Sequence, residues 1–362
     1  MLSGEAQGSF RVTRYTRADQ AQALELIAAS VAPPTAERLI RQWEWKYDAH
    51  PFNPERGPDV LLLWDADRVV GMLPSFPLRV AVHGREYRSL AFSDFMLHPA
   101  SRGHGLSQLL IARSIAERMS GISWENVAAR RAATPLSSGR CSRLSFLVRP
   151  LDLPRIAQML LGRGTADQPR AGEQAPPAPR RVHPAGLVVE PLSWDDERLD
   201  ALWERVRDAH AVLCVRDRAA LRWRFGSRPD ARYTLLGAAR GPEGHPAELL
   251  GYVVFRVALR DGLLRGQIVD LLADPRAPQA LGPLIEAAVV ALRRDHAALV
   301  ACVASAPAYR RALYRRGFVP FRREAPAYFC AYGRQREPEL QPFLDPAQWF
   351  LTMGDGDLEL GY

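Results

Sequence analysis

One segment of the 362-residue sequence combines glycines, basic side chains and a hydroxyl in a pattern suited to binding an anion. It runs from Leu97 to Ser107, reads LHPASRGHGLS, and joins an apolar stretch to an amphipathic one. Gly103 and Gly105 permit tight backbone turns and close approach to a ligand. The first N–H groups of a following helix lack internal partners, and the helix dipole favours negative charge. With Arg102 as a charged donor, this segment predicts a pyrophosphate-binding loop.

The stretches around this loop must position it. Ser89–Leu97 is an apolar run that predicts a strand, and Leu106–Met119 carries an apolar face that predicts a helix. Upstream, the pattern predicts a strand, two helical stretches and two more strands, at Phe10–Arg14, Ala21–Ile27, Thr35–Trp45, Val60–Trp64 and Val69–Val82. A mixed sheet with helices packed on its faces is the economical architecture, so we expect an α/β (α+β) fold.

The sequence repeats this arrangement at an interval of about 178 residues. Trp45-Lys46-Tyr47 precedes Pro51 with the same spacing that separates Trp223-Arg224-Phe225 from Pro229. Further matches in the same order join Val69-Val70-Gly71 to Leu249-Leu250-Gly251, and Asp94–Pro99 to Asp270–Pro275. We interpret this as an ancestral duplication.

Between the copies lies a Pro-, Ala- and Gly-rich stretch that reads as a linker. We therefore expect domains at residues 1–161 and 187–362, joined by a linker at 162–186.

Composition excludes several classes of protein. No run approaches the ~18 uncharged apolar residues of a membrane helix. Met1–Arg11 lacks the pattern of a secretory signal. The four cysteines lie far apart without a CxxC pair, at Cys141, Cys214, Cys302 and Cys330. We therefore expect neither a disulfide framework nor a zinc knuckle, and a cytoplasmic location.

The charge is strongly basic, with a net +8 and a pI of about 9.7. Lys46 is the single lysine among 48 basic residues, and the rest are arginine. A GC-rich genome explains this bias, and so does a protein that binds phosphates or CoA-type cofactors. The arginines are scattered and no zinc-finger or RNP pattern is present, so we expect no nucleic-acid partner.

The loop also resembles a known family. Arg102-x-x-Gly105-x-Ser107, after a strand and a proline, is similar to the R/Q-x-x-G-x-G/A loop of GNAT N-acetyltransferases, with Ser in place of the usual Gly or Ala. The duplicated pattern resembles the tandem-domain subgroup of that superfamily. The resemblance implies two tandem GNAT-like domains, each a mixed central sheet flanked by helices.

The resemblance also implies acetyl-CoA as co-substrate in the first half. Its pantetheine arm would pair with the strand backbone at Phe95, Met96 and Leu97. Its pyrophosphate would lie on the loop, with contributions from Arg102, Gly103, His104, Gly105, Leu106 and Ser107. An amine would then attack the thioester directly, without a covalent enzyme intermediate.

Each half lacks one part of the family's usual site. The second half has Pro278, Gln279, Ala280, Leu281 and Pro283 where the first has its loop from Arg102 to Ser107. The glycines are therefore absent, and two prolines remove backbone donors. It does contain Tyr314 in ALYRRGF, which resembles the family's motif for the tyrosine that protonates the departing thiolate. The first half has Leu136 at that place. Tyr314 is therefore either an acid or a packed relic of the duplication, and we favour the relic.

A general base in the first half must come from elsewhere. Asp94 lies on the strand before the loop, and Glu125 lies on the next expected strand, at 122–127. Either carboxylate is suited to accept the amine proton, and His98 and His104 are nearby alternatives. Asn126 is a candidate for contacting the acceptor or cofactor.

Three functions fit these observations. The first is an acyl-CoA-dependent N-acyltransferase, with acetyl-CoA as donor and the amine of a small molecule or amino sugar as acceptor. The second is a tandem GNAT-like transferase that uses aminoacyl-tRNA, which the retained loop disfavours. The third is a non-catalytic binding module. We expect no metal and no membrane span, and oligomeric state stays open.

Overall fold

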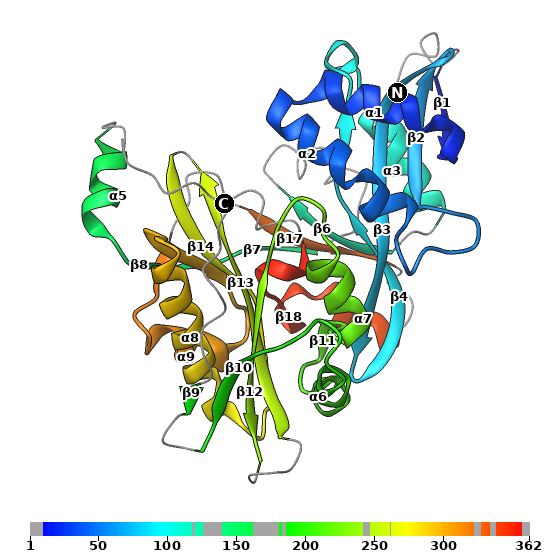
Figure 1. The fold of residues 1–362 in the computed structure, drawn as a ribbon. Helices are drawn as coiled ribbons and strands as arrows, with labels where there is room; N and C mark the ends of the chain where they lie inside the picture. Colours follow the sequence, from blue (N-terminus) through cyan, green and yellow to red (C-terminus); the bar gives the residue numbers. More distant parts are fainter. Residues whose placement is uncertain are drawn as a thin grey trace.

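The computed structural model describes residues 10–117, 120–125, 140–161, 181–182, 186–241, 247–260, 262–321, 327–333 and 338–356. Within them, ten strands form a first mixed sheet in the order β1-β2-β3-β4-β6-β17-β7, with β5, β11 and β18 paired beside this path (Figure 1). These strands are β1 Phe10–Arg14, β2 Val60–Asp65, β3 Arg68–Val82, β4 Arg85–Phe92, β5 Met96–Leu97, β6 Gly121–Glu125, β7 Arg140–Arg143, β11 Val212–Cys214, β17 Tyr328–Tyr332 and β18 Trp349–Phe350.

Eight strands form a second mixed sheet in the order β16-β8-β15-β14-β13-β12-β10-β9. They are β8 Phe146–Pro150, β9 Arg181–Val182, β10 Val188–Pro191, β12 Thr234–Arg240, β13 Glu248–Arg260, β14 Leu263–Ala273, β15 Leu299–Val303 and β16 Val319–Phe321. β14 and β15 run parallel, and the other pairs are antiparallel. The α/β class predicted from the sequence is therefore confirmed.

Helices cover both sheets (Figure 1). They are α1 Gln20–Ser30, α2 Pro33–Trp43, α3 Ser107–Ala116, α5 Leu153–Leu160, α6 Arg198–Val206, α7 Arg218–Leu221, α8 Leu281–Arg294, α9 Pro307–Tyr314 and α10 Gln341–Leu344. The run 60–64 in β2 is buried throughout because α3 packs on one face of the strand and the core shared with α1 and α2 lies on the other. The first half thus holds α3, and the loop before it, against a rigid sheet.

The two halves of the chain exchange strands. β17, from the second half, lies between β6 and β7 of the first sheet, antiparallel to both. β8, from the first half, lies between β15 and β16 of the second sheet, antiparallel to both. Each sheet therefore contains one strand from the other half of the chain. The two sheets thus do not correspond to two separate stretches of sequence on either side of one linker. The domain limits given above stay a prediction, because residues 162–180 lie outside the described residues.

The repeated tryptophans meet where the halves join. Trp45 and Trp223 stack with ring centroids 5.0 Å apart and an interplanar angle of 17°. The indole N–H of Trp45 donates to the Trp223 carbonyl at 3.0 Å, and that of Trp223 donates to the Trp45 carbonyl at 3.4 Å. Such a reciprocal contact is what a local two-fold relation between similar surfaces produces. It supports the duplication inferred from the sequence.

Three expectations need correction. The expected strand at 89–97 is two strands, β4 and β5, because residues 93–95 leave the ladder. The α-helix begins at Ser107 and ends at Ala116, short of the expected limit. Cys141 and Cys330 form a disulfide, since they lie opposite each other on β7 and β17.

The cysteines had carried the expected cytoplasmic location, and this disulfide removes that argument. Within the described part of the chain, no helix is long and apolar enough to cross a membrane.

Candidate functional site

Two neighbouring strands diverge beside the glycine loop. β4 and β6 run parallel and are paired up to Phe92 and Ser123. Beyond Phe92 the chain leaves β6, and the next strand, β5, pairs with β3 through Met96 and Leu97. Among the described residues no ladder joins β5 to β6. One edge of β5 therefore faces the divergence instead of another strand, and this edge is where the family resemblance implies a pantetheine arm.

Asp94 holds the break between β4 and β5. It has a left-handed φ of 53°, which Asp tolerates better than most residues. Its Oδ2 accepts hydrogen bonds from Lys46 Nζ at 2.8 Å and from Tyr47 Oη at 2.6 Å. Lys46 is only 1% exposed and also donates to Ser93 Oγ. Asp94 is thus anchored by the single lysine of the chain, a contact suited to shaping the backbone.

The loop presents an open backbone. Gly103 and Gly105 have φ values of 84° and 72°, and a Cβ added to either would meet nothing within 4 Å. Among the described residues, the amides of 103–107 donate no hydrogen bond, although Gln108 and Leu109 already begin the helical pattern. Five adjacent donors therefore lie free at the N-terminus of α3, a ten-residue helix. This arrangement suits a pyrophosphate.

The basic side chains of the loop have different partners from those expected. Arg102 Nη2 donates to the Ser30 carbonyl at 2.9 Å and Nε to the Leu97 carbonyl at 3.2 Å. Arg102 thereby ties the loop to the end of α1. His98 Nδ1 accepts from the Ala100 amide at 3.3 Å, and His104 is exposed. The backbone of the loop, more than these side chains, is therefore the part that suits an anion.

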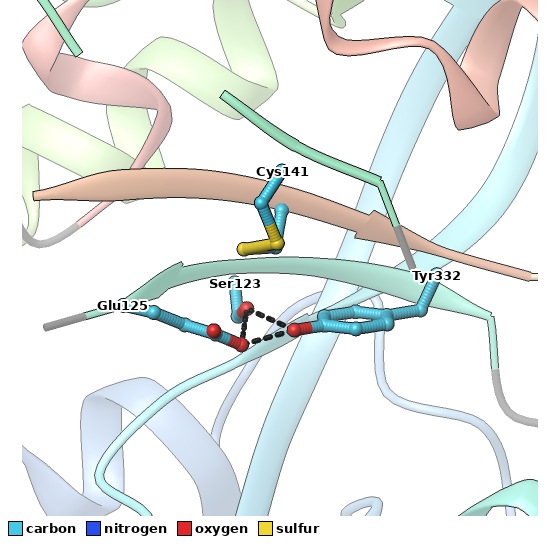
Figure 2. Close-up of a disulfide and its surroundings, with 5 residues drawn as sticks. Ser123, Glu125, Cys141 and Tyr332 are labelled. Carbon is cyan, nitrogen blue, oxygen red and sulfur yellow. Dashed lines mark hydrogen bonds between the residues drawn. A yellow bond between two sulfur atoms is a disulfide. The ribbon is translucent and has the colours of Figure 1, made fainter. Parts of the chain in front are cut away.

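Glu125 ends β6 on the far side of the divergence and is 7% exposed. Its Oε1 accepts hydrogen bonds from Ser123 Oγ at 2.7 Å and from Tyr332 Oη (Figure 2). Its Oε2 is buried without a partner in the described part of the chain. A buried carboxylate oxygen without a donor costs free energy unless something binds there. This geometry separates Glu125 from Asp94, whose carboxylate is already engaged.

Tyr332 is the site residue that sequence reasoning missed. It belongs to β17, so the second half of the chain supplies it to the first half's site. Its ring also packs edge-on against Phe92, with centroids 6.2 Å apart. No local motif marks it, because its position depends on the exchange of strands. Asn126, the other candidate beside Glu125, lies outside the described residues.

The second half is closed at the corresponding places. Ala273 is the counterpart of Leu97. Its amide donates a hydrogen bond to Tyr309 Oη at 3.0 Å, and the Tyr309 hydroxyl donates to the Ala273 carbonyl at 3.3 Å. Tyr314 is 38% exposed on α9 and accepts a hydrogen bond from Arg310. Within the described part of the chain, no contact joins Tyr314 to Glu125.

The C-terminal segment folds back between the halves. β18 pairs with β11, and both carboxylate oxygens of Asp355 accept hydrogen bonds from Arg216 Nη2 at 2.7 Å. Arg216 also contacts Asp270, the counterpart of Asp94. These groups line a pocket between the halves together with aromatic side chains: Phe52, Phe76, Trp223 and Phe225. The C-terminal segment thus helps to line this pocket.

Comparison with known proteins agrees with this geometry. Residues 11–122 match the family described as acetyltransferase (GNAT) domain. A search of curated protein sequences found no match to this chain. Among solved structures, N-myristoyltransferase of Saccharomyces cerevisiae with bound myristoyl-CoA is similar at TM-score 0.57 and 14% identity, over 91% of this chain and 80% of that one. A probable N-acyltransferase from Enterococcus faecalis is similar at TM-score 0.55 and 12% identity, over 89% and 72%.

A GCN5-related N-acetyltransferase from Anabaena variabilis is also similar, at TM-score 0.57 and 13% identity, over 89% of this chain and 72% of that chain. At these identities the structural matches show the fold. The chain therefore has a two-sheet fold that resembles the tandem GNAT fold of N-myristoyltransferase, and the match to the GNAT domain family covers residues 11–122.

Proposed function

We propose that this chain transfers an acetyl group from acetyl-CoA to the amine of a small molecule or an amino sugar. The observation that carries the proposal is the row of five free amides at residues 103–107, at the N-terminus of α3. Their left-handed glycines leave open space where side chains would otherwise stand. Such a backbone cradle fits the pyrophosphate of a CoA ester.

The edge of β5 that faces the divergence is the proposed place for the pantetheine arm. Phe95, Met96 and Leu97 lead from there directly to the loop. Backbone groups on an unpaired strand edge are donors and acceptors that an extended amide-containing ligand can satisfy. The thioester would then lie toward Glu125, across the divergence.

Glu125 is the proposed general base. Its free Oε2 is positioned to accept a proton from an attacking amine, while Ser123 and Tyr332 hold Oε1. The amine nitrogen forms the new bond to the acyl carbon, and the CoA thiolate leaves with its electron pair. We assign Asp94 to holding the backbone break, and we propose no catalytic role for Tyr314.

Two structural features favour acyl transfer from a CoA ester over the other two functions considered, the aminoacyl-tRNA-dependent transferase and the binding module. A transferase that uses aminoacyl-tRNA would not need an open pyrophosphate cradle, and a binding module would not need a buried carboxylate with an unused oxygen. Both features are present in the first half, so acyl transfer from a CoA ester accounts for more of the structure.

The test is a transfer assay. Acetyl-CoA is supplied with amines of four kinds, namely amino sugars, polyamines, amino acids and peptide N-termini, and free thiol and acetylated product are both measured. We expect one thiol released per acetyl group transferred for at least one class. Repeating the assay with longer acyl-CoA esters defines the donor. Absence of product from every CoA ester, with or without aminoacyl-tRNA, would overturn the proposal.

A further inference from the structure

The disulfide lies directly against the proposed catalytic carboxylate. Cys141 and Cys330 face each other on β7 and β17, with Cα atoms 4.1 Å apart. Ser123, whose hydroxyl holds Glu125, is the residue opposite Cys330 on the other side of β17. Figure 2 shows the sulfur atoms beside Ser123 and Glu125, on the same side of the sheet as Tyr332.

Three potential metal ligands therefore meet at one point. A carboxylate oxygen of Glu125 and the two sulfur atoms all lie within 4.8 Å of one another. Cys330 is 0% exposed and Glu125 is 7% exposed, so these two ligands are shielded from water, whereas Cys141 is partly exposed. Carboxylate Oε2 has no hydrogen-bond donor among the described residues, so a ligand position is open on it.

The chemistry of this donor set suits zinc. Two thiolates and a carboxylate are common zinc ligands, and three protein ligands leave a fourth position open. Zn–S distances of about 2.3 Å in a tetrahedral site separate two sulfurs by roughly 3.8 Å. That separation requires the disulfide bond to be broken. The hydrogen bonds from Ser123 and Tyr332 to Oε1 would orient the carboxylate ligand from behind.

We propose that, once the Cys141–Cys330 disulfide is reduced, Glu125 and these two cysteines bind one zinc ion. A dithiol reductant supplies two electrons and two protons to the disulfide, giving two thiols and leaving the reductant as a disulfide. Zinc binding then releases both thiol protons to solvent. The disulfide and the zinc site use the same sulfur atoms, so they are mutually exclusive states of the chain.

Zinc binding also has a consequence for activity, which rests on the proposed function. The ion would occupy the carboxylate that acyl transfer needs as base. Zinc would therefore inhibit the reduced protein and leave the disulfide form active. CoA binding at the loop would be unaffected, because none of the three ligands belongs to residues 102–107.

The experiment uses the full chain in both redox states. The protein is reduced with dithiothreitol, freed of reductant without oxygen, and titrated with zinc against a chromophoric chelator. We expect one zinc per reduced chain with a dissociation constant below 1 micromolar, and none for the oxidised chain. Cobalt substituted at the site should give the sulfur-to-cobalt absorption and visible bands of a tetrahedral thiolate complex.

Variants separate this site from other thiols. Cys141→Ser and Cys330→Ser should each abolish tight binding, and Glu125→Gln should weaken it by at least tenfold. Cys302→Ala is the matched control, because Cys302 is a buried free thiol of the second sheet. The proposal would be overturned if the oxidised chain or Cys141→Ser bound as much zinc as the reduced chain. Loss of zinc binding in Cys302→Ala, or no zinc binding by the reduced chain, would overturn it as well. Gly105→Trp should retain zinc binding while losing CoA, so the two proposals fail independently.

Discussion

The two halves of this chain share one plan and differ where a cofactor would lie. In the first half, β5 separates from β6 and leads into a loop with five free amides. In the second half, β14 likewise leaves β15 after Ile268, but the backbone groups of Ala273, the counterpart of Leu97, are taken by Tyr309. Ladder register makes Ala304 the counterpart of Glu125, since Ile268 pairs with Cys302 as Phe92 pairs with Ser123. The second copy has thus lost both the cradle and the carboxylate.

The difference teaches that the second half supports the site of the first. It has kept a well-packed core, and it supplies β17 and Tyr332 to the first sheet. Its own buried charges pair among themselves, with Arg216 between Asp270 and Asp355. After a duplication in which one copy loses its site, selection on that copy acts on its packing. Because the two halves exchange strands, the first half still needs the second half to complete its sheet.

The largest effect should come from Gly105→Trp. A side chain at this left-handed position would fill the open space over the free amides. We expect complete loss of CoA binding in a calorimetric titration, with a destabilisation of only about 1–2 kcal/mol. Gly57→Trp is the matched control, since Gly57 also has a positive φ of 91° and nothing within 4 Å of an added Cβ. Loss of binding in both variants would contradict the site.

Glu125→Gln should lower turnover by about a hundredfold or more and leave CoA affinity unchanged, because it removes the base but not the cradle. Asp94→Asn should instead act on stability, by about 3 kcal/mol, since it removes the ion pair between Asp94 and buried Lys46. Rates and chemical denaturation are measured for both. A larger rate loss in Asp94→Asn would exchange the roles of the two carboxylates.

Acid should destabilise both halves by the same mechanism. Burial, and secondarily the charge of Arg224, lowers the pKa of His50 to about 3. Burial, and secondarily Arg216, lowers the pKa of His210 to about 4. Below pH 6.5 the unfolded chain binds protons at these histidines before the folded chain does. Stability is therefore fully present above pH 6.5 and falls as pH drops toward these values, by up to about 1.4 kcal/mol per pH unit for each.

The matched variants His50→Phe and His210→Phe check this expectation. Each should reduce the pH dependence of the unfolding free energy between pH 6.5 and 4, measured by urea denaturation. An unchanged slope in both variants would assign the acid sensitivity to other groups.

The smallest effect should come from Tyr314→Phe. Its hydroxyl is exposed and contacts Arg310 on the same helix, away from the recorded contacts of Glu125. We expect less than a twofold change in turnover, measured beside Glu125→Gln in the same assay. A loss for Tyr314→Phe that exceeds the loss for Glu125→Gln would move the active site to the second half.

Local features of the fold were predictable from the sequence. The apolar run of β2 and the helix after the loop each follow from the local spacing of apolar residues. The pairing of Trp45 with Trp223 follows from the repeat of their short motif along the chain. Gly103 and Gly105 identified the loop because a backbone with positive φ strongly favours glycine, so two nearby glycines indicate a tight turn.

Features that depend on contacts between distant segments were not predictable. β17 enters the first sheet from about 200 residues away, and with it come Tyr332 and the disulfide partner of Cys141. The break at Asp94 depends on buried Lys46, which no local periodicity indicates. Asp94 and Glu125 therefore looked equivalent in sequence and differ only through their partners.

The central claim is that one half of a duplicated fold retains the cofactor site. Isothermal titration of the protein with acetyl-CoA tests it most directly, because the stoichiometry distinguishes the halves. We expect saturable binding at one acetyl-CoA per chain, with CoA alone competing for the same site. Two sites per chain would contradict the closed second half, and absence of binding at millimolar ligand would contradict the cradle at 103–107.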